Sequence, residues 1–427
     1  MDNKLEGQPN AMSTLSTWLC YLEQLHHRPI ELGLARIEQV AYTLEVLKPA
    51  PYVITVAGTN GKGTTCRMLE MILINAGYQV GVYSSPHLIH YRERVRINNA
   101  YLSDEMHVKA FELIEQARND ISLTYFEYST LAALLLFKQA QLDVIILEVG
   151  LGGRLDATNI VESDLSVITS IALDHTDWLG DNRESIGREK AGIFRFNHPA
   201  IVGEPDMPKS IVDYAKLLDS TLYTCEPNPG ASWSYTIADD SWSFDADRRH
   251  YRNLPLPHIP IANAATAIAT LLYSALSFDE RSLRAALEST TLQGRMQIIA
   301  HDPLVILDVA HNPHASNYLN EQLQRLRKKQ HSDGVLRMVV GMLKDKDIES
   351  TLSKLNADYW YCGSLQGQRG APAEKLAQYL PTEKTKQFSC VVDAWQCAQS
   401  EASKNDIIVI CGSFHTVAQV MEYLGYE

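Results

Sequence analysis

One stretch of the sequence, Tyr52 to Ala76, limits the possible folds more than any other. It opens with the apolar run Val53-Ile54-Thr55-Val56, continues through Gly58-Thr59-Asn60-Gly61-Lys62-Gly63-Thr64, and then takes on helical periodicity. A buried strand, a glycine-rich loop and a helix in this order are the context of a phosphate-binding loop. The glycines let backbone N–H groups converge on an anion, and the helix N-terminus adds partial positive charge. The sequence therefore predicts an α/β domain that binds a nucleotide through this loop.

Within the loop, Lys62 can place a full charge on the β- and γ-phosphates of ATP. Thr64 can offer a hydroxyl to Mg²⁺, unless another residue does so. The spacing departs from the usual G-x-x-x-x-G-K-[ST] pattern, since Val56 stands at the first glycine position and Gly63 separates Lys62 from Thr64. The alternative is a glycine-rich turn that binds nothing, but it explains neither the lysine nor the strand and helix on either side.

Short apolar runs separated by helical patterns recur along the chain. Their residues are apolar throughout rather than alternating, which indicates strands buried on both faces of a parallel sheet. The predicted strands are Tyr52–Val56, Val80–Tyr83, Val144–Leu147, Ser166–Ile171, Ala200–Gly203, Leu304–Asp308, Arg337–Gly341, Tyr359–Cys362 and Ile407–Cys411. The first helix between them is predicted over Thr65–Ala76, before Gly77. Strands that alternate with helices indicate a doubly wound α/β fold.

The middle of the chain breaks this alternation. Ser232–Asp247 alternates aromatic and polar residues, as an antiparallel hairpin does, and Ile261–Leu276 is an alanine-rich helical stretch. A second series of strands and helices follows. A chain of 427 residues is expected to form two or three domains. We place the limit near 296–302, which gives an N-terminal domain over 1–296 and a smaller Rossmann-like domain over 297–427.

The charge balance and the cysteines narrow the classes of partner and compartment. A formal net charge of -13 argues against nucleic acid as the main partner, but allows a small anionic ligand in a locally positive pocket. The seven cysteines contain no C-x-x-C pair, which fits a reducing cytoplasm better than disulfides or zinc. Met1–Asn10 lacks the apolar core of a signal peptide, and no run reaches the ~18 apolar residues of a membrane span. No segment has the pattern of a dedicated interface, so we expect a cytoplasmic monomer.

Three polar residues come shortly after predicted strands: Ser85, Glu148 and His175. In an open parallel sheet, ligands bind beyond the carboxyl ends of the strands, so these side chains should share an edge with the phosphate loop. Hydroxyl and carboxylate oxygens suit Mg²⁺, and imidazole is a less common ligand. Alternatives remain open: the carboxylate could lie on the surface, the histidine could be structural, and Asp174 and Asp177 compete with it.

Eight motifs carry a resemblance to known proteins that covers most of the chain, from about residue 30 to about residue 420. They are GTNGKGT (58–64), SSPH (84–87), YFEY (125–128), EVGLGGRLDATN (148–159), DHTDWLG (174–180), EKAGIF (189–194), DVAHNP (308–313) and CGSFHT (411–416). Together they closely resemble the Mur ligase superfamily and, within it, the bacterial dihydrofolate synthase/folylpolyglutamate synthase family. The first motif points to the superfamily, and the third, fourth and fifth narrow the resemblance to the folate branch.

The resemblance implies an ATP-dependent amide ligase that uses Mg²⁺ at two sites. A substrate carboxylate would attack the γ-phosphate to give an acyl phosphate, which the amine of L-glutamate would then attack. The implied acceptors are dihydropteroate, which yields dihydrofolate, and reduced folates, which gain further glutamates. A Mur ligase that acts on a cell-wall precursor is the nearest alternative, and the third and fourth motifs argue against it. A nucleotide-binding regulatory protein without catalysis is the alternative from another class.

The resemblance also assigns residues to ligands. Those implied to hold ATP are Thr59, Asn60, Gly61, Lys62, Gly63, Thr64, Asn263, Arg295 and Asp308. Those implied to hold metal are Ser85 and Glu148 for one ion and His175 for the other. Those implied to line the pterin pocket are Glu31, Leu32, Gly33, Leu34, Thr124, Tyr125, Phe126, Glu127, Leu155, Asp156 and Ala157. Those implied to contact glutamate are His311, Ser413 and His415. Without the resemblance, the two aromatic residues of this pocket would be interpreted as core residues.

Lys62, Lys190 and Arg295 are the implied catalytic residues. Lys190 taken alone fits the polar face of a short helix, but the resemblance implies that it is carbamylated. That modification turns a cation into an anionic oxygen ligand, and it requires a lysine with a lowered pKa. Arg295 would reach the γ-phosphate. It is flanked by Gln293 and Met296, where the family pattern leads us to expect Pro and Phe, so the local backbone conformation stays open.

Overall fold

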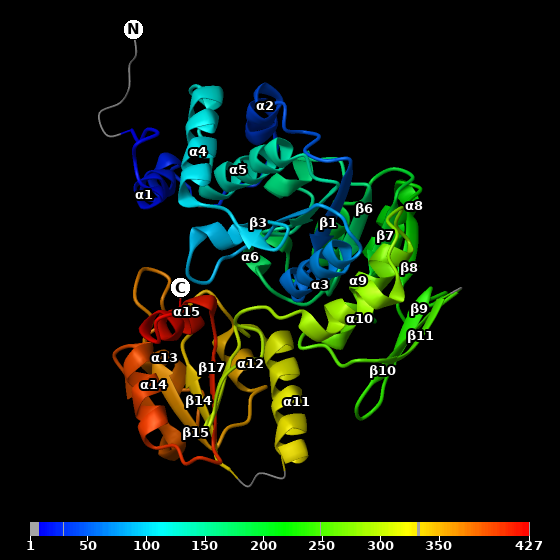
Figure 1. Ribbon diagram of the computed structural model, residues 1–427. Helices are drawn as coiled ribbons and strands as arrows, with labels where there is room; N and C mark the ends of the chain where they lie inside the picture. The colour runs from blue at the N-terminus through cyan, green and yellow to red at the C-terminus, as the bar shows by residue number, and fades with distance from the viewer. Residues whose placement is uncertain (1–7, 29, 248, 331–333, 427) are drawn as a thin grey trace. The chain divides into compact units, whose positions relative to one another are not determined.

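The computed structural model describes residues 8–28, 30–247, 249–330 and 334–426, so most of the Met1–Asn10 segment lies outside the described residues. The chain divides into two compact units (Figure 1). The first unit holds Met1–Ser85 and Tyr91–Thr290, and the second holds Pro86–His90 and Thr291–Glu427. The short segment 86–90 therefore belongs to a different unit from the residues on either side of it. The domain limit expected between 296 and 297 stays a prediction.

The first unit is built on an eight-stranded sheet in the order β4-β3-β2-β5-β1-β6-β7-β8. Six of its strands are parallel: β1 (Tyr52–Ala57), β2 (Val80–Tyr83), β5 (Val144–Glu148), β6 (Leu165–Ile168), β7 (Pro199–Val202) and β8 (Thr221–Thr224). The short strands β3 (Val95–Ile97) and β4 (Ala100–Tyr101) add an antiparallel edge. The predicted parallel α/β architecture is confirmed, although β6 ends at Ile168 rather than Ile171.

Helices cover both faces of this sheet, because its central strands bury alternate side chains in opposite directions (Figure 1). Ile54 and Val56 of β1 pack in the cluster that contains α3 (Lys62–Asn75), α9 (Ile261–Leu272) and α10 (Glu280–Ser289). Val53 packs in the opposite cluster. The helices of that cluster are α1 (Leu15–Leu25), α2 (Ala35–Thr43), α4 (Asp104–Arg118) and α5 (Tyr125–Ala140). Buried strands with a helix layer on each face leave the strand ends as the place for a site.

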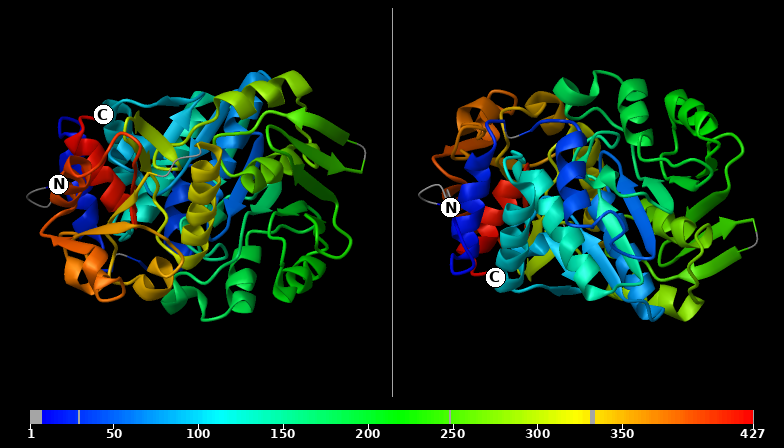
Figure 2. Two further views of the ribbon diagram at one scale, coloured as in Figure 1. Left: turned by 90° about the horizontal axis from the view of Figure 1, so that it is seen from below. Right: turned by 90° about the horizontal axis from the view of Figure 1, so that it is seen from above.

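The first unit contains further helices and a second, smaller sheet. Helices α6 (Thr176–Leu179), α7 (Arg183–Ala191) and α8 (Lys209–Leu217) follow β6 and β7, with turns η1 (Tyr91–Arg94) and η2 (Ala157–Ile160) elsewhere in the unit. A separate antiparallel sheet, visible at one end of the unit in Figure 2, contains β9 (Trp233–Ile237), β10 (Trp242–Ala246) and β11 (Arg249–Leu254). The predicted hairpin is confirmed as β9 and β10. The alanine-rich helix ends at Leu272, four residues before the predicted end at Leu276.

The second unit has its own sheet, in the order β12-β13-β17-β14-β15-β16. Its strands are β12 (Gln297–His301), β13 (Leu304–Leu307), β14 (Leu336–Val340), β15 (Tyr359–Gly363), β16 (Thr385–Phe388) and β17 (Ile407–Cys411). All are parallel except β12, which pairs antiparallel with β13. Its helices are α11 (Pro313–Gln330), α12 (Ile348–Leu352), α13 (Ala373–Ala377), α14 (Val391–Ser400) and α15 (Phe414–Tyr423), with turn η3 (Thr382–Lys384). The four strands predicted here are all present.

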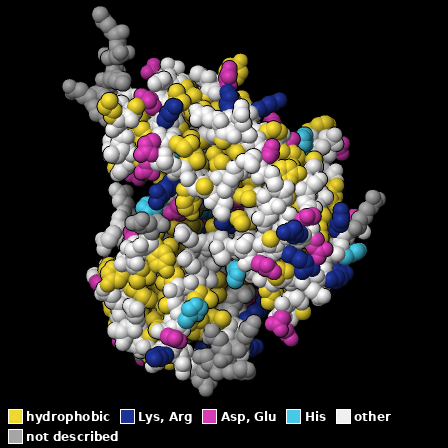
Figure 3. Space-filling model, in the orientation of Figure 1, with side chains coloured by type: hydrophobic (Ala, Val, Ile, Leu, Met, Phe, Trp, Pro, Cys, Tyr) yellow, Lys and Arg dark blue, Asp and Glu magenta, His cyan; other side chains and the backbone are white. Residues whose placement is uncertain are grey.

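Charged side chains of both signs are interspersed on the face that Figure 3 shows. Among the described residues drawn there, Lys and Arg do not form the broad field that a phosphate backbone requires. None of the helices in the described part of the chain is long and apolar enough to cross a membrane.

Candidate active site

The phosphate loop joins β1 to α3, and two of its glycines are required by the local geometry. Gly61 precedes the helix in the left-handed region, at φ 86°, which other residues rarely adopt. A Cβ atom on Gly58 would lie 1.9 Å from Oγ1 of Thr169, so only glycine lets the loop pass this close to the end of β6. The helix begins at Lys62, three residues before the predicted start at Thr65.

Lys62 folds back over its own loop. Its ammonium group donates to the carbonyl oxygens of Gly58, at 2.9 Å, and Thr59, at 3.3 Å. The ammonium group has three donors and a flexible stem, so it can leave these carbonyl oxygens and bind the oxygens of a phosphate instead. The geometry therefore suits the predicted role of Lys62 toward an anion.

Thr64 is held by a residue from a distant helix. Its buried hydroxyl donates to the carbonyl of Gly61 at 3.0 Å and accepts a hydrogen bond from Nδ2 of Asn263 at 2.7 Å. Asn263 comes from α9, so the fold brings this predicted nucleotide contact to the phosphate loop. The hydroxyl of Thr64 already makes two hydrogen bonds. The residues at the other strand ends are therefore better candidates for the metal ligand.

Two hydroxyl residues at the end of β6 support the loop, and the sequence did not single them out. The side chains of Thr169 and Ser170 donate to the carbonyl of Asn60 at 2.7 and 2.9 Å. The backbone of Ser170 accepts from the N–H of Thr59 at 2.8 Å. These bonds fix the loop conformation that glycine permits. Threonine and serine are common at strand ends, so no local pattern distinguished them.

Ser85 and Glu148 lie together at the expected edge of the sheet. Glu148 is the last residue of β5 and is buried, and Ser85 follows β2, the neighbouring strand. The backbone N–H of Ser85 donates to Oε2 of Glu148 at 3.3 Å. A buried carboxylate and a serine whose backbone contacts it bring together carboxylate and hydroxyl oxygens, the kinds of donor that suit Mg²⁺. The prediction that these residues share an edge with the phosphate loop is confirmed by the parallel strands.

His175 lies farther along the loop that follows β6. It has left-handed backbone at φ 53° and precedes α6, and its side chain is 38% exposed. Its backbone N–H donates to Oδ1 of Asp174 at 2.9 Å, and its Nε2 lies 4.0 Å from the same oxygen. The imidazole lies at the surface next to a carboxylate, and the role of His175 as a metal ligand stays a prediction.

Lys190 is buried on α7, where a lysine is costly unless its charge is removed. Burial, and then the positive charge of Lys62, lower the pKa of Lys190 to about 7, while Asp174 and Asp156 act in the opposite direction. A large fraction of this lysine is therefore a neutral amine near neutral pH, which is the form that reacts with CO₂. This meets the physical requirement for the predicted carbamylation.

Asp156 holds the glycine-rich loop after β5 in shape. Its buried carboxylate accepts from the backbone N–H of Leu151 at 2.9 Å, and from the N–H and hydroxyl of Thr158 at 3.0 and 2.7 Å. Burial raises the pKa of Asp156, although these hydrogen bonds favour the charged form. Leu155 beside it is half-buried, and Ala157 begins the turn η2. The loop is thus fixed from within before any ligand binds.

The two aromatic residues at the start of α5 adjoin this loop. The ring of Phe126 fills the space that a Cβ on Gly150 would need, at 2.5 Å, and packs against Tyr83 with ring centroids 5.9 Å apart. Tyr125 lies beneath the guanidinium group of Arg94, 5.3 Å from its ring centroid. Both rings are only partly buried, which leaves surface for a flat ligand.

Thr124 and Glu127 cap α5 with their side chains. The hydroxyl of Thr124 accepts from the N–H of Glu127 at 3.2 Å, and the Glu127 carboxylate accepts from the N–H of Thr124 at 2.7 Å. Glu127 also accepts from Arg36 at 3.0 Å, and Arg36 in turn pairs with Glu31. Both capping residues therefore have structural roles of their own beside the predicted pocket. The half-buried residues Leu32, Gly33 and Leu34 lie between Glu31 and α2.

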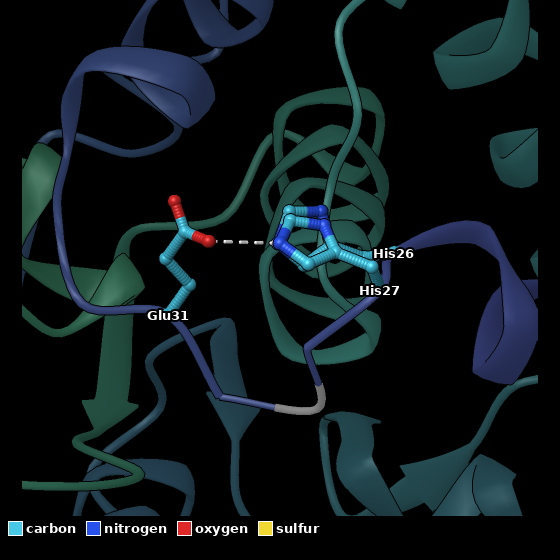
Figure 4. Close-up of side chains that lie close together, drawn as sticks. All are labelled: His26, His27 and Glu31. Carbon is cyan, nitrogen blue, oxygen red and sulfur yellow. Dashed lines mark hydrogen bonds and ion pairs between the residues drawn. The ribbon is translucent and has the colours of Figure 1, made fainter.

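His26, His27 and Glu31 lie close enough together to attract notice as a metal site (Figure 4). Their ligand atoms are within 4.8 Å of one another. However, the two ring nitrogens of His26 bond to Ser122 at 2.7 Å and to Glu31 at 3.1 Å, and Glu31 also pairs with Arg36. A carboxylate already paired with a guanidinium group is poorly suited to a cation, so we assign these residues to the packing around Glu31.

In the second unit, Arg295 and Asp308 lie near the carboxyl end of β13. The Asp308 carboxylate accepts from the backbone N–H groups of Met296 and Ala310, both at 2.9 Å. Burial raises the pKa of Asp308, and Arg295 partly opposes that shift. Arg295 lies over the ring of Phe414 at 4.9 Å. Met296 takes φ 44°, a left-handed conformation unusual for methionine, which answers the question that the sequence left about this backbone.

The predicted glutamate contacts lie at the ends of β13 and β17. His311 bonds through Nδ1 to the carbonyl of Val309 at 2.9 Å, and its ring lies 6.1 Å from that of Phe414. Ser413 caps α15 by accepting from the N–H of Thr416 at 3.0 Å. His415 is exposed on the same helix. Phe414, which contacts both Arg295 and His311, was not predicted, because an aromatic residue at a helix start has no distinctive pattern.

Comparison with known proteins gives these features a family. Residues 56–247 match the Mur ligase middle domain, and residues 294–414 match the Mur ligase glutamate ligase domain. The dihydrofolate synthase/folylpolyglutamate synthase of Escherichia coli K12 is 56% identical over 422 residues, which cover 98% of each chain. The chain belongs to the dihydrofolate synthase/folylpolyglutamate synthase family of Mur ligases. It is therefore a ligase, and the predicted resemblance is confirmed.

Solved structures of this family share the fold throughout. E. coli FolC in complex with DHPP and ADP superimposes with a TM-score of 0.94 at 55% identity, covering 98% of this chain and 99% of that chain. The Yersinia pestis bifunctional enzyme complexed with AMPPNP and Mn has a TM-score of 0.92 at 56% identity, covering 98% and 99%. At this identity the family fold is common to both units of the chain.

Proposed function

We propose that this ligase joins L-glutamate to dihydropteroate, giving dihydrofolate, and to reduced folates, giving polyglutamates, with ATP cleaved to ADP and phosphate. The relatives that match nearly the whole chain bear the names of both activities, and their structures hold ADP or AMPPNP, Mn and DHPP. A related structure also holds L-glutamate. These are the participants that an acyl-phosphate route requires.

The observation that carries this proposal is the shared edge of β1, β2, β5 and β6. Their parallel register brings the phosphate loop, the Ser85–Glu148 contact and the loop that leads to His175 to one side of the sheet. A site of this kind serves phosphoryl transfer, which depends mainly on positioning and on neutralising charge. Lys62 supplies one positive charge at the loop, and it must offset the repulsion between a substrate carboxylate and the γ-phosphate.

The donor groups fit a divalent metal. Ser85 offers a hydroxyl and Glu148 a buried carboxylate, the two residues are joined by the backbone N–H of Ser85, and we assign the first ion to them. We assign a second ion to His175. The carbamate of Lys190 would place a negative charge near this ion. Bound metal would supply further positive charge against the transferring phosphoryl group. The phosphate-binding backbone would come from Thr59, Asn60, Gly61, Gly63 and Thr64, with Asn263 against the loop.

The acceptor side of the site is proposed around the aromatic start of α5. Phe126 is supported as the stacking partner of a flat pterin, because its ring lies against the glycine-rich loop that Asp156 fixes. Thr124, Tyr125, Glu127, Leu155 and Ala157 would complete this wall with Glu31, Leu32, Gly33 and Leu34. In this assignment the domain over 1–296 binds ATP and pterin.

The domain over 297–427, with Arg295 just before it, would contribute the remaining contacts. Asp308 accepts hydrogen bonds at the end of a strand, a place where a carboxylate can bind ribose hydroxyls. Arg295 would neutralise phosphate charge. His311, Ser413 and His415 are proposed to bind the incoming glutamate. Monomeric state and action in the cytoplasm complete the proposal, and the seven cysteines, all free, suit a reducing compartment.

A single assay tests the reaction. ADP release is measured with L-glutamate and either dihydropteroate or tetrahydrofolate, and each substrate is omitted in turn. We expect turnover that requires glutamate and a pteroate or folate together. Turnover that continues without any pteroate or folate would refute the proposal. Turnover with dihydropteroate but not with tetrahydrofolate would remove the polyglutamylating half alone.

A further inference from the structure

The first unit contains a buried ion pair between α3 and β3 that takes no part in the proposed chemistry. Glu70 on α3 and Arg96 on β3 are 0% and 7% exposed. Arg96 contacts Oε2 of Glu70 through Nε and through a second guanidinium nitrogen, each at 3.0 Å. Arg67 contacts the same oxygen at 2.9 Å. A pair this deeply buried often stabilises a fold no better than apolar residues of the same volume. Its geometry therefore points to a role besides stability.

The guanidinium group of Arg96 has one more nitrogen, and it reaches Ser84. This nitrogen, NH1, donates to Oγ of Ser84 at 3.2 Å. The backbone N–H of Ser84 also donates to the carbonyl of Arg94 at 2.9 Å, so the residue is held from two sides. Because the guanidinium plane is rigid, its bonds to Glu70 set the direction of its bond to Ser84. Lysine at this position could not make all of these contacts in fixed directions.

Ser84 is the residue immediately before Ser85, the proposed metal ligand. Ser85 donates from its backbone to Glu148 at 3.3 Å. A continuous path of contacts therefore runs from Glu70 through Arg96 and Ser84 to the Ser85–Glu148 pair. Glu70 lies on α3, the helix that begins at Lys62, so the path joins the helix of the phosphate loop to the loop after β2.

We propose that Arg96 is a positioning residue, which holds Ser84 in line with Glu70 and thereby orients Ser85 beside Glu148 for a divalent metal ion. This rests on the proposed function, because that function assigns Ser85 and Glu148 to metal. Arg96 acts through Ser84 rather than on the ion. Groups of this outer kind orient metal ligands, and their loss typically weakens metal affinity or activity by about 10- to 100-fold.

Two variants test the path at different points. Ser84→Ala removes the hydroxyl and leaves the Glu70–Arg96 pair intact. Arg96→Lys keeps a positive charge beside Glu70 but loses the rigid fork. The measurement is Mn²⁺ affinity in the presence of a non-hydrolysable ATP analogue, from the paramagnetic resonance signal of free Mn²⁺, together with thermal unfolding. We expect each variant to bind Mn²⁺ about tenfold more weakly. The double variant should bind no more weakly than either single one, because both interrupt one contact.

Controls separate this inference from the assignment on which it rests. Arg284→Lys alters an exposed pair with Glu280 on α10 and should leave Mn²⁺ affinity unchanged. Ser85→Ala and Glu148→Gln should weaken Mn²⁺ binding at least as much as the test variants do. If these two weaken binding while Ser84→Ala binds Mn²⁺ like the wild type, the positioning role is overturned. If Ser85→Ala and Glu148→Gln also bind like the wild type, the metal assignment itself fails.

Discussion

Raising the pH from about 6 to about 8 in bicarbonate should convert Lys190 from a largely unmodified lysine into a carbamate. The reaction joins the neutral amine nitrogen to the carbon of CO₂ and releases a proton. With a pKa of about 7, the amine is roughly 90% neutral at pH 8. A lysine with the ordinary pKa of 10.5 is only about 0.3% neutral there. Burial and Lys62 thus increase the reactive fraction of Lys190 by about 300-fold.

Carbon NMR with ¹³C-labelled bicarbonate measures this directly. At constant CO₂ a carbamate resonance should grow with pH, because a higher pH both increases the neutral amine and removes the proton that the reaction releases. Lys190→Met should abolish the resonance. Lys209→Met, which removes an exposed lysine at the start of α8, should leave it unchanged. A resonance that persists in Lys190→Met, or none in the wild type at pH 8, would refute the reasoning from burial to carbamylation.

The carbamate should matter for the rate more than for nucleotide binding. Lys190→Ala removes the anionic group, so we expect kcat to fall by about 10²- to 10³-fold, with a smaller change in the affinity for an ATP analogue. Acetate or formate should restore part of the rate, because each can fit the vacated space with a carboxylate. A wild-type kcat in Lys190→Ala would end the proposal.

Three further predictions follow from the described geometry. His107 is fully buried and burial lowers its pKa to about 4, so the unfolded chain binds its proton first and stability falls as the pH drops from 6.5 towards 4. The free energy of unfolding, measured with urea, should therefore decrease between pH 7 and pH 5 by about 2 kcal/mol less in His107→Leu than in the wild type. An unchanged pH dependence in the variant would contradict this. Gly58→Ala should weaken the binding of an ATP analogue more than tenfold in calorimetry, because the new Cβ would lie 1.9 Å from Thr169. In the control Gly77→Ala the new Cβ meets nothing within 4 Å, so the binding of the analogue should not change. Phe126→Leu should raise KM for dihydropteroate about tenfold at constant KM for ATP in steady-state assays, and equal changes in both would argue against stacking.

The sequence predicted the parallel strands that are buried on both faces and missed β3, β4, β8, β11, β12 and β16, which lie at or next to the edges of their sheets. Val144–Leu147 is apolar throughout because helices cover both sides of β5, and such a run is rarely found outside a buried element. In the missed strand β11, Tyr251 and Leu254 are buried three positions apart, and the other four residues are exposed and polar or charged. Strand β3 is only three residues long. Each pairs with a strand close by in the sequence, β11 with β10 and β3 with β4, but neither carries an apolar run by which local composition would reveal it.

The candidate site divides in the same way. Glu148 stands out in the sequence because a charge at the end of an apolar run is costly without a purpose, and Lys62 stands out because it lies in a glycine-rich loop between a strand and a helix. Thr169 and Phe414 do not stand out, because hydroxyls and aromatic rings are ordinary in strands and helices. Arg96 gave no signal at all, since its partner Glu70 lies 26 positions away and their pairing exists only once α3 and β3 are folded.

The segment Pro86–His90 belongs to the second unit, although the residues before and after it in the sequence belong to the first. Leu88 and Ile89 pack into the apolar cluster of the second unit, where Leu88 lies near Gly294 and Val309. A gene fragment that starts at Thr291 would therefore encode the second unit without these two side chains and leave apolar surface uncovered. To express that unit alone, an engineer would need to graft the five residues back as a linker or replace that surface with polar side chains. Three peptide links, rather than one, hold the two units in a single chain.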